Sequence, residues 1–170
     1  NVFKGSFNFF MDLPKIDKRR TEKKFKDLNE KNEDLPKYFL RNFHYQTDGY
    51  LSEKSANLYE FQVETLFSGS AATMRRFSLL PIIKYLNSNN ENLNFLDIGT
   101  GSGEFIKTIK YNLPKLNITC SDISRAYLEV AKKKLKNFTD INFRNCKGED
   151  LPFENKSFDI INSVYLFHEV

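Results

Sequence analysis

The chain has 170 residues, of which 40% are hydrophobic and 15% aromatic, a composition typical of a folded globular protein and not of a disordered one. Its first 50 residues hold 11 Lys and Arg against 8 Asp and Glu, and the net charge of the whole chain is +4. So small a basic excess does not indicate a nucleic-acid-binding face, and no apolar run approaches the roughly 20 residues of a membrane-spanning helix.

The chain has two cysteines, Cys120 and Cys146, and two histidines, with no CxxC and no metal-ligand spacing among them. We therefore expect no metal site, and free thiols buried in strands. Free thiols indicate a reducing, cytoplasmic location.

Residues 1–89 form a first region, which we interpret as an N-terminal arm and helical cap. The charged stretch 15–33 indicates a surface helix or a loose arm. Asp34 is a plausible helix cap and predicts a helix over 34–43. The Asp48–Gly49 pair that follows is typical of a turn.

Three further features complete the first region. Ser52 predicts the start of a helix that reaches about Phe67, with Leu66 and Phe67 in its apolar stripe. The SGS sequence at 68–70 ends this helix, and another begins near Ala71. Pro81 either kinks that helix or starts a new one ending near Leu86.

Residues 90–170 form a second region in which short apolar runs alternate with helical patterns. We expect strands at 94–98, 116–122, 141–146 and 158–164, and helices at 103–113 and 124–138. Strands spaced by helices of this length predict an α/β fold with a doubly wound, Rossmann-like parallel sheet. The last strand is apolar enough to be buried on both faces, so we expect the given sequence to stop before the remaining strands of such a sheet.

The sequence LDIGTGSGEF places three glycines, Gly99, Gly101 and Gly103, directly after the first of these strands. A dinucleotide fingerprint requires GxGxxG, but here the third glycine comes one residue early and Glu104 stands in its place. A glutamate in the first helical turn also repels a pyrophosphate. Asp97, at the end of the strand, suits a cationic ligand, although it could instead cap the following helix.

Asp122 ends the second strand, 23 residues after Gly99. That spacing suits a carboxylate that accepts hydrogen bonds from two ribose hydroxyls, and Ile123 can lie against a purine. The alternative is an Asx turn before Ser124. A ligand with a ribose, a purine and a positive charge but without an essential phosphate matches S-adenosylmethionine.

Three motifs in this order, LDIGTGSGEF, CSDISRAYLEVAKKKL and GEDLPFENKSFDIINSVYLFHEV, resemble the class I S-adenosylmethionine-dependent methyltransferases. Within that family the chain is similar to the group that includes quinone- and sterol-modifying enzymes. The resemblance covers residues 93–170 and implies an enzyme with an S-adenosylmethionine-binding Rossmann-like domain, of which about three strands are absent here.

The resemblance also implies a cofactor-binding set. It consists of Asp97, Gly99, Thr100, Gly101, Asp122, Ile123, Gly148, Glu149 and Ser163. Many similar enzymes carry an acid two residues before Glu149, where it accepts from the adenine amino group, but this chain has Lys147 there. Glu149 or a main-chain carbonyl would have to substitute. Arg75 and Arg76 either reach the cofactor's carboxylate or form an ordinary surface pair.

Methyl transfer from a sulfonium needs a general base only when the acceptor must lose a proton, so no catalytic residue is assigned from the sequence. His168, Tyr45 and Tyr50 are the candidates, each with a structural role as the alternative. The sequence NSVYLF stands where amide- and adenine-methylating enzymes carry an NPPY-type run. We therefore expect a small-molecule acceptor, with oxygen or carbon favoured, and leave a homodimer open.

Three alternative functions remain. A non-catalytic S-adenosylmethionine-binding regulatory or scaffold protein keeps the fold and is favoured if Lys147 weakens adenine binding. A nicotinamide-dependent dehydrogenase is disfavoured by Gly103 and Glu104. An RNA methyltransferase would use the basic segment 15–37 as a docking arm, although nucleic acid is not the partner that the charge distribution predicts.

Overall fold

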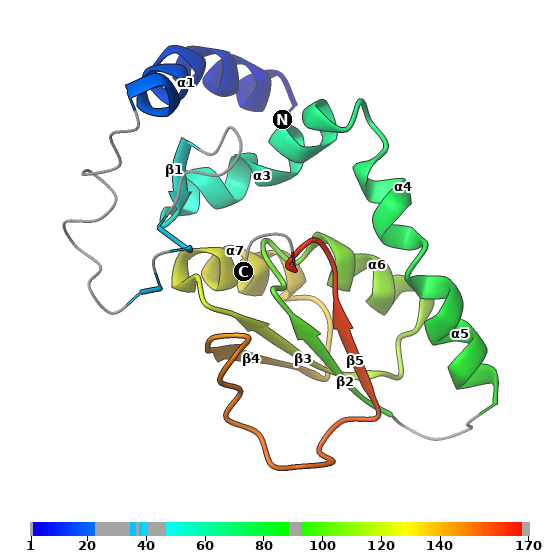
Figure 1. The fold of residues 1–170 in the computed structure, drawn as a ribbon. Coiled ribbons are helices and arrows are strands. Elements are labelled where there is room, and N and C mark those ends of the chain that lie inside the picture. Colours follow the sequence, from blue (N-terminus) through cyan, green and yellow to red (C-terminus); the bar gives the residue numbers. More distant parts are fainter. Residues whose placement is uncertain (1, 23–34, 37, 41–46, 89–92, 168–170) are drawn as a thin grey trace.

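The computed structural model describes residues 2–22, 35, 36, 38–40, 47–88 and 93–167 (Figure 1). Its elements are, in chain order, α1 (Val2–Glu22), β1 (Thr47–Tyr50), α3 (Glu53–Leu66), α4 (Ala71–Arg76), α5 (Leu79–Asn87), β2 (Asn94–Ile98), α6 (Glu104–Asn112), β3 (Asn117–Asp122), α7 (Arg125–Leu135), β4 (Ile141–Asn145) and β5 (Ile160–Ser163). Among these helices, none is both long and apolar enough to cross a lipid bilayer.

Strands β2 to β5 form one sheet in the order β4-β3-β2-β5, and each neighbouring pair is parallel. This confirms the predicted α/β fold with a parallel sheet. The carboxyl ends of the strands lie at one edge, where β2 ends at Ile98, β3 at Asp122 and β5 at Ser163. A ligand site is expected at that edge, beyond the carboxyl ends.

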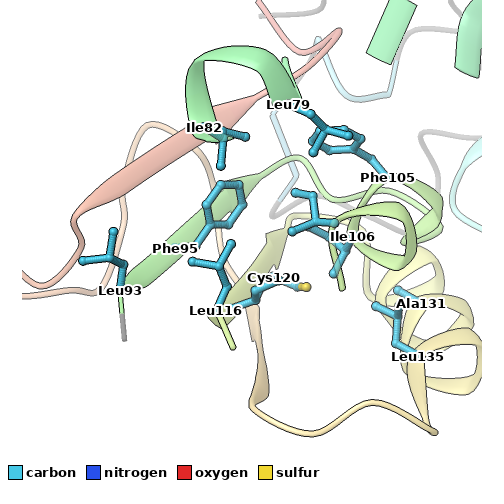
Figure 2. Close-up of a cluster of buried hydrophobic side chains, with 12 residues drawn as sticks. Leu79, Ile82, Leu93, Phe95, Phe105, Ile106, Leu116, Cys120, Ala131 and Leu135 are labelled. Atoms are coloured by element: carbon cyan, nitrogen blue, oxygen red, sulfur yellow. The ribbon is translucent and has the colours of Figure 1, made fainter. Parts of the chain in front are cut away.

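The hydrophobic core lies between the sheet and three helices (Figure 2). Phe95 of β2 and Ile118 of β3 are adjacent in register and fully buried. Helix α5 contributes Leu79 and Ile82, and α6 contributes Ile106 to the same cluster. Helix packing on this face therefore fixes where β2 and the glycine turn that follows it can lie.

Strand β5 is the edge of the described sheet, and only one of its two faces is buried there, so burial of both faces stays a prediction. Ile160 pairs with Phe95 and packs against the core, whereas Ile161 pairs with Leu96 on the opposite face and is 62% exposed. Within the described part of the chain, no helix contacts β5 closely enough to cover that second face. An apolar run alone does not reveal which of its faces is covered.

The N-terminal region places α3 against α7. Ser52 begins α3 as predicted, because its hydroxyl accepts a hydrogen bond from the Ser55 N–H. The expected apolar stripe ends earlier than predicted, since Leu66 and Phe67 are 46% and 37% exposed. Asp48 and Gly49, predicted as a turn, lie within β1; Gly49 has a positive φ, and the Leu51 N–H donates to the Asp48 carbonyl, so the chain turns where this short strand ends.

Two other expectations concern the ends of helices. Of the helix predicted over 34–43, the described residues show a single turn at 38–40, in which the Phe39 N–H donates to the Pro36 carbonyl. Pro81 lies in the first turn of α5 and does not kink a continuous helix, in agreement with the second of its two interpretations.

The boundary between 1–89 and 90–170 stays a prediction, because residues 89–92 lie outside the described ranges.

Gly103→Ala should destabilise the fold more than Gly69→Ala. Both glycines have φ near +80°, so both alanines meet the left-handed penalty of about 1–2 kcal/mol. A Cβ at Gly103 would also lie 3.0 Å from the Ala131 Cβ of α7, whereas nothing lies within 4 Å at Gly69. Overpacking of this kind costs about a further 1–3 kcal/mol. Urea unfolding of the two variants measures the difference, and equal losses would contradict the packing argument.

Candidate functional site

The turn after β2 is held by the end of β3. The backbone N–H groups of Gly99 and Thr100 both donate to the Ser121 carbonyl, at 2.9 and 3.0 Å. Gly101 has φ of +61°, and nothing lies within 4 Å of the point where its Cβ would stand. The turn thus presents bare backbone to open space, as the sequence predicted for a ligand-contacting loop.

A cavity of about 230 Å³ opens beside this turn at the carboxyl edge of the sheet. Seven predicted cofactor-binding residues line it, namely Gly99, Gly101, Asp122, Ile123, Gly148, Glu149 and Ser163. The structure therefore brings together most of a set whose members lie up to 64 positions apart in the chain. No Lys or Arg is among the described lining residues, so this cavity offers no charge partner to a pyrophosphate.

Asp122 is the last residue of β3, and each of its two carboxylate oxygens accepts a hydrogen bond from a backbone N–H. Its Oδ2 accepts from the Gly101 N–H at 2.7 Å and its Oδ1 from the Ser124 N–H at 2.8 Å. The second contact is the Asx turn that the sequence offered as an alternative, and it coexists with a position on the cavity wall. Burial raises the pKa of Asp122 to about 6, against the effect of these two hydrogen bonds.

Asp97 and Thr100 lie in a second, smaller cavity of about 40 Å³, which shares Gly99 and Gly101 with the first. The Asp97 side chain is almost fully buried and accepts from Asn162 Nδ2 at 2.7 Å and from Thr100 Oγ1 at 2.8 Å. Burial raises its pKa to about 6, although both hydrogen bonds favour the ionised form. Asp97 does not cap α6, whose first helical residue follows Gly103.

Arg75 lines the smaller cavity as well, and the interpretation of Arg75 and Arg76 as a surface pair is wrong for Arg75. Its side chain is 9% exposed and forms two hydrogen bonds with the Glu60 carboxylate of α3. Arg76 is exposed and donates to Thr73. Among the described residues, one guanidinium and three carboxylates, those of Asp97, Glu60 and Glu104, therefore line the same small cavity.

Two hydroxyls on the cavity wall have no hydrogen-bond partner among the described residues. They are Ser163 Oγ, at the end of β5, and the Tyr165 hydroxyl. Tyr165 lines both cavities, and its φ of +60° is a strained backbone conformation for a non-glycine residue. Sequence analysis missed Tyr165 as a site residue, because nothing in NSVYLF signals a left-handed residue.

The cap contributes an aromatic wall to the larger cavity. Tyr50, one of the catalytic candidates, lines it and packs against Phe39, Tyr59 and Tyr127 with ring centroids 5.6–6.5 Å apart. Tyr38, which was not predicted, lines it too. The other catalytic candidates, Tyr45 and His168, lie outside the described residues.

The second region of the chain is similar in sequence to known methyltransferases. Residues 95–170 match the methyltransferase domain family. The demethylmenaquinone methyltransferase of Thermotoga maritima is 39% identical over 72 residues, which are 42% of this chain and 30% of that enzyme. The highly reducing polyketide synthase bet1 of Neocamarosporium betae is 29% identical over 132 residues, which are 74% of this chain and 4% of the synthase.

Among solved structures, the plantazolicin methyltransferase BpumL in complex with S-adenosylhomocysteine is 21% identical, with a TM-score of 0.44 over 90% of this chain and 50% of that one. By sequence, residues 95–170 are similar to methyltransferase domains, over somewhat less than half of the chain. Within that class they are similar to the quinone-methylating enzymes. The chain spans about a third of the length of the quinone-methylating relatives that it matches.

The residues present fit S-adenosylmethionine. The hydroxyls of Ser163 and Tyr165 line the cavity without partners in the described chain, so they are free to bond a polar ligand. Asp122 retains unused lone pairs beside the bare backbone of Gly101. The smaller cavity is lined by acids and one arginine, whose charges are complementary to those of an ammonium, a sulfonium and a carboxylate group.

The raised pKa of Asp97 predicts a pH-dependent stability. A carboxyl whose pKa rises from 3.8 to about 6 on folding stabilises the fold fully below pH 3.8, and this contribution is lost as the pH rises through 6. The full shift corresponds to about 3 kcal/mol. Wild type should therefore lose stability relative to Asp97→Asn between about pH 4 and pH 7. Urea unfolding of both proteins across this range measures the difference, which would stay constant if Asp97 titrated normally.

Proposed function

We propose that this protein transfers the methyl group of S-adenosylmethionine to a small, largely apolar acceptor through carbon or oxygen. The observation that carries the proposal is the Asp122 carboxylate, held at the carboxyl end of β3 by the Gly101 and Ser124 N–H groups. A carboxylate fixed on the cavity wall in this way is suited to accept from two ribose hydroxyls. Ile123, the next residue, lines the same cavity and offers an apolar surface to adenine.

The methionine end of the cofactor would lie toward the smaller cavity. There Asp97 and Glu60 complement an ammonium group, and Arg75 complements a carboxylate. Glu60 engages two of the five N–H donors of Arg75, so the guanidinium retains donors for a ligand. Gly99 and Gly101, which line both cavities, allow a ligand to pass along the backbone between them.

A bound sulfonium supplies an activated methyl group, so the protein's own task is alignment and exclusion of water. The aromatic wall of Tyr50, Tyr59 and Tyr127 supports that role, because it closes the cavity with apolar surface. Burial raises the pKa of Tyr165, so its hydroxyl stays protonated near neutral pH and donates a hydrogen bond instead of acting as a base.

The acceptor side of the cavity is lined mainly by aromatic and aliphatic side chains. That lining supports an apolar acceptor, and the quinone-methylating relatives include enzymes named as C-methyltransferases. The two described cysteines are both free, which supports a reducing compartment such as the cytoplasm. A homodimer stays a prediction.

Asp122→Ala should weaken binding of S-adenosylhomocysteine by roughly tenfold to a hundredfold, the scale of hydrogen bonds to a charged group. Isothermal titration calorimetry measures the change. Asp17→Ala is the matched control, because Asp17 is an exposed carboxylate on α1, away from the larger cavity. Equal affinity of Asp122→Ala and wild type would overturn the proposed ribose contact.

Titrations with other ligands, together with an assay of methyl transfer, separate the alternative functions. Binding of NADH in place of S-adenosylhomocysteine would support a dehydrogenase and overturn the proposal. Binding of S-adenosylhomocysteine without methyl transfer to any acceptor would support a regulatory protein. Salt-dependent binding of RNA that needs residues 15–37 would support an RNA methyltransferase.

Tyr165→Phe should separate stability from binding. The lost hydroxyl has no partner within the described structure, so the variant should unfold at the same or a higher temperature than wild type. If that hydroxyl bonds a ligand, the affinity for S-adenosylmethionine or the rate of methyl transfer should fall by about fivefold to tenfold. Thermal unfolding and calorimetry test the two effects, and a variant that is destabilised but binds normally would contradict this role.

A further inference from the structure

We propose that Tyr38 is a positioning residue that holds the Glu149 carboxylate so that it accepts a hydrogen bond from the exocyclic amino group of the cofactor's adenine. This inference rests on the proposed function. It assigns to the cap a part in recognising the cofactor, in addition to any contact with the acceptor.

The contact between the two side chains is direct. The Tyr38 hydroxyl donates to Glu149 Oε1 at 2.5 Å, across 111 residues of sequence. Both residues line the larger cavity, together with Gly148 and Ile123. Tyr38 lies in a turn whose next residue, Phe39, is buried and stacks on Tyr50 with ring centroids 5.6 Å apart. The hydroxyl is therefore presented from an anchored segment.

Besides the Tyr38 hydroxyl, the backbone N–H of Glu149 itself donates a hydrogen bond to the Glu149 carboxylate. Glu149 is exposed, and a glutamate side chain on the surface samples many rotamers. Lys147, two residues earlier, carries an ammonium group, which cannot accept a hydrogen bond. The described lining residues include two carboxylates, Asp122 and Glu149, and Glu149 is the one next to Gly148.

The charge state of the pair suits this role. The hydrogen bond from Tyr38 keeps the pKa of Glu149 below its usual value, and burial together with Glu149 raises the pKa of Tyr38. The proton therefore stays on the phenol and the carboxylate stays ionised at neutral pH. The phenol and the backbone N–H of Glu149 take about two of the four acceptor sites of the carboxylate, and the others remain for a ligand.

An ionised acceptor at this position selects for a donor on the purine. The adenine amino group donates a hydrogen bond, whereas a purine without that group leaves the carboxylate without a partner. The ratio of the two affinities therefore reports on the Glu149 contact itself. A loss of packing in the cap would weaken both ligands equally and leave the ratio unchanged.

The test compares S-adenosylhomocysteine with its 6-unsubstituted purine analogue, which lacks the amino group, by calorimetry on the full chain. Wild type should bind S-adenosylhomocysteine roughly tenfold more tightly, the scale of one hydrogen bond to a charged group. Tyr38→Phe keeps the ring and removes the hydroxyl, and should reduce this ratio to about twofold to threefold. Tyr111→Phe is the control, because Tyr111 is an exposed tyrosine of α6 that packs on Phe138, and should leave the ratio unchanged.

Glu149→Ala should abolish the discrimination, and Tyr38→Phe should then have no further effect on it, as expected for two residues that act through one contact. An unchanged ratio in Tyr38→Phe, or equal binding of both ligands by wild type, would overturn this inference and leave the proposed function standing. Failure of wild type to bind S-adenosylhomocysteine at all would instead overturn the proposed function.

Discussion

The hydrogen bond from the Gly101 N–H to the Asp122 carboxylate joins the turn after β2 to the end of β3, and the site depends on it. It fixes the acid at the point where two neighbouring parallel strands end. Parallel strands deliver their carboxyl ends to one edge, so Ile123 and Ser163 meet around the same acid. The raised pKa of Asp122 shows that burial of the charge is only partly offset by its backbone donors, and a polar ligand would complete that compensation.

A polar network couples this edge to the cap. The Glu60 carboxylate of α3 accepts from Arg75 and from the Ser102 hydroxyl in the glycine turn. Lys134 of α7 donates to the same hydroxyl and pairs with Glu104 at 3.0 Å. Burial opposes ionisation of Glu104, but its lysine partners prevail and lower its pKa. The network thus fixes the cap against the turn, which explains how residues from the first part of the chain can form the wall of a cavity at the sheet edge.

Local signals made much of the fold predictable. Strand 94–98 has the predicted limits, and Ser52 and Ser124 begin helices because each hydroxyl accepts from an N–H three residues later. Exposure was harder to predict. Ile161 and Leu66 belong to apolar patterns, yet both are exposed, because a pattern records the preference of a residue and not what packs against it.

The same distinction separates the site residues that the sequence predicted from those that it did not. Asp97 and Asp122 were predictable because each stands at the end of a strand, at a fixed spacing from the glycines. For Arg75 the sequence left two interpretations open, because its burial depends on Glu60 of another helix. The Tyr38–Glu149 contact spans 111 residues and leaves no periodicity that a sequence could display. The residues of the glycine turn and of the strand ends can therefore be found from short motifs, whereas the part of the site that the cap contributes depends on tertiary contacts between residues far apart in the sequence.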